Sequence, residues 1–345
     1  MATIGQSYPN LIDAYKASAE GTVIEILNRQ NPILDDGIAT QCNMDAVHRH
    51  MIRTGLPSVA WGRLYQGVPQ SKSTMQQVDD TTGFLEAASL VDSRLLALAP
   101  DPAKQRLVDS SPYLEAMNQE MATGIFYHDT ATTPEKFKGL SARFSLYNTN
   151  RPDPAKPNIA NHVIHGGGAG SDNTSIWFVT WGDHATSLLY PKGTKAGVSI
   201  EDKGEQRVLD ANGNPYYAKE TMFRWHIGAF VKDFRYNARI ANIDVSDMIA
   251  GTVDLWALMR KAYYRLQSRR RDAVSSRIAI YMNRDVLEIL DAQSSDRSLL
   301  AANPNYTGLS QAVVEGKEVK TYRGIPIRET DAILNTEALV GSVAI

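Results

Sequence analysis

The longest regular alternation of side chains in this sequence runs from Tyr216 to Asp244. Met222, Arg224 and His226 fall on one face of an extended strand, and Phe223, Trp225 and Ile227 fall on the other. An ordinary strand has about 5–6 residues, so this pattern predicts β structure that reaches beyond a single compact core. Elements of this kind more often make contacts between subunits than perform chemistry.

Residues 56–92 predict an extended hairpin. Val59–Tyr65 has the composition of a strand, the stretch that follows is polar and rich in turn residues, and apolar side chains return from Phe84 onward. A polar loop of this length in a compact domain usually has a function or a partner. Upstream, residues 1–55 predict short helical elements with little core of their own.

Two stretches have the apolar spacing of helices. In residues 100–128, Asp101 and Ser111 each precede a proline, so one bent helix and two abutting helices both fit the pattern. The second helix is predicted over 246–267, with Ser246 as its N-cap. Strands are predicted over 175–181, 277–282 and 318–328. Helices and strands interleave without a regular βαβ rhythm, which predicts the α+β class.

Bulk composition narrows the class of protein. The 345 residues are 43% hydrophobic and 21% charged, with a net charge of -2, so no global attraction to nucleic acid or to anionic membranes is expected. Apolar runs fall short of the ~20 residues that span a bilayer, and the first residues do not resemble a signal peptide. Cys42 is the single cysteine, which excludes an internal disulfide framework. We expect a protein that folds in a cytoplasm.

Candidate chemistry is sparse. His165 followed by three glycines copies the oxyanion loop of many esterases, but the chain has no G-x-S-x-G elbow to supply the serine. The pairs His48 with His50 and His162 with His165 lack a third ligand at zinc spacing, and no phosphate-binding glycine motif is present. The sequence therefore predicts no catalytic residue, no cofactor and no metal.

One basic cluster is present. It consists of Arg265, Arg269, Arg270 and Arg271. Guanidinium groups bind phosphate bidentately, so this cluster is the candidate for contact with DNA. The alternative is a solvated helix end whose charge favours the C-terminal dipole.

The order of these segments resembles that of tailed-bacteriophage major capsid proteins with the Hong Kong 97-type fold, in the form found in some short-tailed phages. The segments that carry the resemblance are WGRLYQGVPQSKSTMQQVDDTTG (61–83), GIFYHDTATTPEKFKGLSARF (124–144), FRWHIGAFVKDFRYNARIANID (223–244), AIYMNRDVLEILDAQ (279–293) and YRGIPIRETDAIL (322–334). No single segment is a chemical motif; their order and spacing make the match.

This resemblance implies a layout. It places an N-terminal arm at 1–55 and an extended loop, the E-loop, at 56–92. The peripheral domain would comprise 93–144 and 196–245, with a spine helix at 100–128 and the long β segment at 216–244. The axial domain would comprise 145–195 and 246–345.

The resemblance also implies a function. The chain would assemble with itself into hexamers and pentamers of an icosahedral virion shell around double-stranded DNA, in the cytoplasm of a bacterial host. Scaffold, portal and decoration proteins would be further partners, contact with DNA would be weak and non-specific, and no membrane is involved. The candidates for subunit contacts are Trp61, Arg63, Tyr65, Lys72, Phe84, Phe223, Trp225, Phe230, Arg235 and Arg239.

Two features of relatives are not expected here. The chain opens with a short arm rather than a long scaffolding segment, so we expect a separate scaffold or none. Lys72 is the single lysine of 56–92, and nothing else signals the lysine–asparagine crosslink of some relatives. The alternatives are a host encapsulin-like shell around an enzyme cargo and, remotely, a hydrolase built on the His165 loop.

Overall fold

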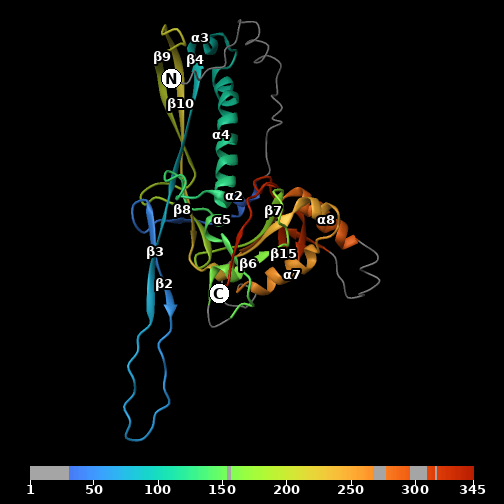
Figure 1. The fold of residues 1–345 in the computed structure, drawn as a ribbon. Helices are drawn as coiled ribbons and strands as arrows, with labels where there is room; N and C mark the ends of the chain where they lie inside the picture. Colours follow the sequence, from blue (N-terminus) through green and yellow to red (C-terminus); the bar gives the residue numbers. More distant parts are fainter. Residues whose placement is uncertain (1–30, 154–156, 268–276, 296–308, 315–316) are drawn as a thin grey trace.

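The computed structural model describes residues 31–153, 157–267, 277–295, 309–314 and 317–345, which form an α+β fold around one large mixed sheet (Figure 1). The strand order is β13-β14-β15-β12-β7-β8-β10-β4, and β1, β6, β9 and β11 pair alongside it. These strands are β1 (Ala39–Gln41), β4 (Gly83–Asp92), β6 (Val163–His165), β7 (Asn173–Trp181), β8 (Thr186–Tyr190), β9 (Val198–Leu209), β10 (Pro215–Val231), β11 (Ala238–Asp244), β12 (Arg277–Met282), β13 (Ser310–Val314), β14 (Lys317–Tyr322) and β15 (Ile325–Glu329).

Strand β7 lies at the centre of the core, and every one of its residues is buried. Trp177, Val179 and Trp181 point to one side of the sheet. Ile176 and Phe178 point to the other side, because successive side chains of a strand alternate. The first side is covered by α2 (Pro32–Asp36), the end of α4 (Pro102–Tyr127) and α5 (Leu140–Arg143), and the second by α6 (Val245–Ile249), α7 (Leu255–Arg265) and α8 (Arg284–Ser295).

The predicted helix at 100–128 is confirmed as α4, one continuous helix of 26 residues. The Asp101 carboxylate caps it by accepting from the backbone N–H groups of Ala103 and Lys104. Pro112 lies inside the helix on its exposed side and does not divide it. In Figure 1 α4 stands alongside the ladder of β4, β9 and β10, with α3 (Ser93–Leu98) at the far end.

The long β segment predicted over 216–244 is confirmed as far as Val231, where β10 ends; the 3-10 turn η2 (Phe234–Tyr236) then separates it from β11. Strand β10 serves two ladders. From Pro215 to Ile227, β10 pairs with β9 on one edge and β4 on the other. From Gly228 to Val231 it pairs with β8 of the central sheet. A side chain at Gly228 would strike the backbone oxygen of Thr81 at 2.8 Å, so glycine permits the close approach at this junction.

The predicted hairpin exists but begins earlier than expected. Its strands are β2 (Val47–Gly55) and β3 (Thr74–Thr81), and Val59–Tyr65 belongs to the tip rather than to a strand. Residues 39–55, expected to be helical, are therefore largely β. Gly83–Asp92, expected to be the returning arm, is β4 and pairs with β10 instead.

Two further boundaries differ from expectation. The helix predicted over 246–267 is divided into α6 and α7, with Gly251 at φ 77 between them and Asp244 and Asp254 as the caps. The strand predicted over 318–328 is a β14–β15 hairpin, because Arg323 and Gly324 both adopt positive φ and form a tight turn.

Candidate assembly surface

The β2–β3 hairpin projects away from the body of the subunit, at the opposite end from α3 (Figure 1). Its tip, residues 56–73, contains a set of apolar side chains that the described residues leave uncovered. Their exposed fractions are 82% for Leu56, 95% for Val59, 99% for Trp61, 92% for Leu64 and 72% for Val68. Exposed apolar groups gathered in this way mark an interaction site.

The hairpin has no core of its own. Its two strands are held by backbone pairing, by the Arg49–Asp79 ion pair at 2.8 Å and by a hydrogen bond between the Thr54 and Thr74 hydroxyls. An isolated two-stranded hairpin is marginally stable in water. The position of the tip therefore depends on the root, where the hairpin meets the body.

At the root, β3 is attached to the body by a buried ion pair. The Arg143 guanidinium of α5 donates to the Asp80 carboxylate at 2.7 Å and to the Ala229 carbonyl of β10 at 3.0 Å. Asp80 is 3% exposed. Beside this pair, His48 and His50 of β2 pack against the ring of Phe230, with ring centroids 4.4 and 5.0 Å away.

The predicted interface residues divide into exposed and buried groups. Trp61, Arg63, Tyr65 and Lys72 lie at the exposed hairpin tip. Phe84 is 48% exposed and stacks on His226, Trp225 is half-buried against the core, and Arg235 pairs with Asp233 at the surface.

The prediction of subunit contacts was wrong for three residues that are buried within the subunit: Phe223, Phe230 and Arg239. Phe223 is 1% exposed and stacks on Tyr113 of α4, Phe230 fills the hairpin root, and Arg239 is 2% exposed. Period-2 alternation assigns residues to two faces of a strand, but it does not show when a helix covers the second face.

The predicted DNA-facing cluster is only partly described. Arg265 ends α7, is half-buried and donates to the carbonyl of Asn161 at 2.8 Å. Burial lowers the pKa of its guanidinium. Arg269, Arg270 and Arg271 lie outside the described residues.

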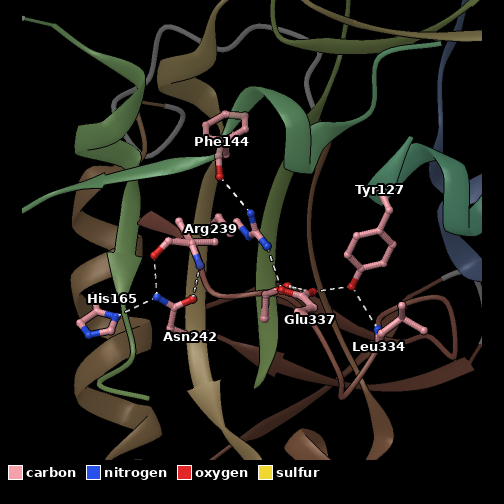
Figure 2. Close-up of polar contacts among 9 residues, drawn as sticks. Tyr127, Phe144, His165, Arg239, Asn242, Leu334 and Glu337 are labelled. Carbon is pink, nitrogen blue, oxygen red and sulfur yellow. Dashed lines mark hydrogen bonds and ion pairs between the residues drawn. The ribbon is translucent and has the colours of Figure 1, made fainter. Parts of the chain in front are cut away.

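A buried polar network joins the C-terminal segment to the core (Figure 2). Arg239 of β11 donates to the Phe144 carbonyl at 2.9 Å and to Glu337 at 2.8 Å, and its guanidinium lies 4.8 Å from the Trp177 ring centroid. The same glutamate accepts from the Ser175 hydroxyl at 2.5 Å and from the Tyr127 hydroxyl. Burial and the Glu337 charge raise the pKa of Tyr127, which keeps this phenol protonated as a donor.

Asn242 extends this network along the C-terminal segment. Its side chain accepts from the Val340 N–H at 2.8 Å and donates to the Val340 carbonyl at 3.0 Å, as a paired strand would. Asn242 adopts φ 56, a conformation that asparagine tolerates better than most residues. No pattern in the sequence pointed to this network, because Glu337 lies in a short irregular segment without periodicity.

The glycine loop after His165 has a packing role. A side chain at Gly166 or Gly168 would meet the Asn242 backbone oxygen at 2.7–2.8 Å. His165 stacks on Tyr147 at 4.6 Å, and its Nδ1 lies 3.2 Å from the Asn242 amide.

Burial and Arg265 lower the pKa of His162 to about 4. Across the described residues no three His, Cys, Asp or Glu side chains are arranged to hold a metal ion.

The described helices include none that is both long and apolar enough to cross a membrane.

The comparison with curated proteins gives no match. Among solved structures, a chain of bacteriophage epsilon15 is 32% identical, with 99% of both chains covered and a TM-score of 0.69.

Two weaker structural matches are the capsid of a native GTA particle and the holo-SrpI encapsulin complex of Synechococcus elongatus PCC 7942. The first is 8% identical over 65% of this chain and 93% of the other, with a TM-score of 0.46. The second is 11% identical over 67% and 95%, with a TM-score of 0.42.

The family model described as "Major capsid protein GP7" matches residues 16–341. Together with the epsilon15 match, this span covers the hairpin, α4 and its ladder, and the central sheet. The chain therefore belongs to the major capsid protein GP7 family: it is a phage shell protein with the Hong Kong 97-type fold.

Proposed function

We propose that this chain is the repeating subunit of an icosahedral shell of hexamers and pentamers around double-stranded DNA, with the hairpin tip as a principal contact between subunits. The observation that carries the proposal is the uncovered tip, where Trp61 is 99% exposed. If a neighbouring copy covered these side chains, the free energy of association would become more favourable by about 25 cal/mol for each Å² of apolar surface removed from water. Many such contacts add over a closed symmetric particle.

The other parts of the layout follow from the same proposal. The arm expected at 1–55 is shortened, because 31–55 contain α2, β1 and β2, which belong to the subunit's own fold; residues 1–30, which lie outside the described residues, remain as the proposed arm across a neighbour. The projecting loop is redefined as 47–81. The axial domain, 145–195 and 246–345, would surround the five-fold and six-fold centres, and the peripheral domain, 93–144 and 196–245, would extend between them. Assembly in a bacterial cytoplasm, weak contact with DNA, and scaffold, portal and decoration partners complete the proposal, in which the chain has no catalytic role.

Light scattering with negative-stain microscopy tests the shell. We expect hollow uniform particles from the chain expressed alone or with its neighbouring genes. A monomer or dimer under every condition would contradict assembly.

The tip is tested separately with the double variant Trp61→Ser/Leu64→Ser. We expect the yield of particles to fall at least ten-fold while the unfolding free energy of the free subunit changes by less than about 0.5 kcal/mol, because exposed side chains contribute little to folding. Leu107→Ser, at a 69% exposed site on α4, is the control and should retain assembly. Normal particle yield from the double variant would remove the tip from the interface.

A further inference from the structure

The hairpin root contains an unusual group of buried polar atoms without hydrogen-bond partners. They are Nδ1 of His48, both ring nitrogens of His50, Oδ2 of Asp80 and Nε of Arg143. Buried polar groups are nearly always paired, so an unpaired group calls for a physical explanation. His50 is 8% exposed, so water reaches its ring poorly.

Several charged groups face the two imidazoles. From β3 the group is Asp80, which is directly opposite His48 in the ladder; its neighbour Asp79 is paired with Arg49 on the other face of the hairpin. From α5 the charged group is Arg143, and after β10 it is Lys232. Cys42 belongs to the same small buried cluster as Phe230.

Charges of both signs act on the two histidines: Asp80 raises the pKa of His48 and of His50, and Lys232 lowers both. Asp80 is already bound to Arg143 at 2.7 Å, and Lys232 adds a second positive charge. Desolvation is the largest effect on both imidazoles and lowers the pKa of His48 and of His50. Both rings are therefore neutral at pH 7.

We propose that the root of the β2–β3 hairpin is an acid-sensitive hinge, in which protonation of His50 and His48 releases the hairpin from Phe230 and changes its angle to the body. A protonated imidazole is a donor at both nitrogens. His50 has no hydrogen-bond partner at either nitrogen in the folded root, so a buried imidazolium would be left unpaired there. Moving β2 off Phe230 exposes the rings to water and removes that cost.

The direction of the effect follows from linkage. The pKa of each histidine is lower in the folded root than in an unfolded chain, so protons bind more tightly when the root opens. The root is fully stabilised above the ordinary histidine pKa, and the stabilisation is lost as the pH falls through the lowered values. The inference concerns the subunit itself and holds whatever the hairpin tip contacts.

Hydrogen exchange of the full-length subunit between pH 7.5 and pH 4.0 tests the hinge, with protection factors corrected for the intrinsic pH dependence of exchange. We expect protection of the β2 and β3 amides to fall at least ten-fold across this range, while the β7 amides keep theirs. In His48→Gln/His50→Leu the loss should be less than three-fold. His226→Gln changes a histidine on β10 that stacks on Phe84 rather than on Phe230, so it is the control and should respond as the wild type does.

An equal loss in the wild type and the double variant would assign the response to other groups and overturn the proposal. Retained protection in the wild type at pH 4.0 would overturn it as well. If near-ultraviolet circular dichroism shows that the double variant does not fold, the single variant His50→Gln replaces it. A response to acid unchanged from that of the wild type in that variant would count equally against the hinge.

Discussion

The hairpin tip and the strand pair β7–β11 differ in what stabilises them. Val59, Trp61 and Leu64 at the tip are almost fully exposed, whereas every residue of β7 and β11 is buried. The strand pair is stabilised by contacts within the subunit, including the charged network of Arg239 and Glu337. The apolar groups of the tip are left uncovered by the described residues, as the proposed contact with a neighbouring copy requires.

Breaking the buried network should give the largest effect on subunit stability. Arg239→Gln would leave the Glu337 carboxylate buried without its counter-charge, and we expect a loss of about 3–5 kcal/mol in unfolding free energy. Denaturant unfolding of the free subunit measures it.

Arg235 provides the matched control, four residues earlier in the chain. Its ion pair with Asp233 has a 49% exposed arginine side chain, so Arg235→Gln should cost no more than about 1 kcal/mol. Equal losses for the two variants would mean that burial of the pair does not determine its importance.

An intermediate effect on the unfolding free energy is expected when valine is replaced by alanine in β7, and the same substitution at the hairpin tip provides the comparison. Val179→Ala in β7 removes two buried methyl groups and should cost roughly 2 kcal/mol, from about 0.8 kcal/mol per buried carbon plus the cavity that remains. Val59→Ala at the tip should leave the unfolding free energy of the subunit within about 0.5 kcal/mol of the wild type.

Thermal or denaturant unfolding of the two valine variants distinguishes the regions directly. A tip variant that destabilised the free subunit as much as Val179→Ala would show that the tip folds back onto its own chain. That result would weaken the case for contacts with a neighbour.

The smallest effect concerns the link between α4 and its ladder. Arg106 donates to Asp202 at 2.9 Å and to the Thr221 hydroxyl at 2.7 Å. Its hydrogen bond, followed by that from the Gly204 backbone N–H, lowers the pKa of Asp202 from 3.8 to about 2. The stabilisation that the ionised Asp202 carboxylate contributes is present above pH 3.8 and is lost as the pH falls toward 2.

In Arg106→Gln, we expect the pKa of Asp202 to rise by more than one unit, measured by NMR titration of the carboxyl carbon. The change in unfolding free energy at pH 7 should stay below about 1 kcal/mol, because the Asp202 side chain is 55% exposed. An unchanged titration midpoint would show that the backbone N–H of Gly204 dominates instead.

The sequence predicted the elements whose pattern is local. The apolar spacing of α4, its Asp101 cap and the alternation in β10 are properties of short windows, so their existence and approximate positions followed from them. The boundaries of the hairpin could not be predicted in this way. Val59–Tyr65 has the composition of a strand, but its apolar side chains belong to an exposed tip.

The buried network lay beyond sequence reasoning for a different reason. Arg239 and Glu337 are 98 residues apart, and either would pass for a surface charge until the fold brings them together. The same limit applies to His50 and Asp80 at the root: nothing in their neighbouring residues shows that Phe230 and Arg143 cover them.

The two-ladder arrangement of β10 has a mechanical consequence. Because one continuous strand belongs both to the ladder beside α4 and to the central sheet, no linker separates these parts, and they cannot rotate freely. A change in their relative angle must instead be distributed as twist along the strand, which β-strands accommodate over a range. Such a strand would let the subunit adopt slightly different curvatures without losing its pairing, as the different positions of the proposed shell of hexamers and pentamers would require.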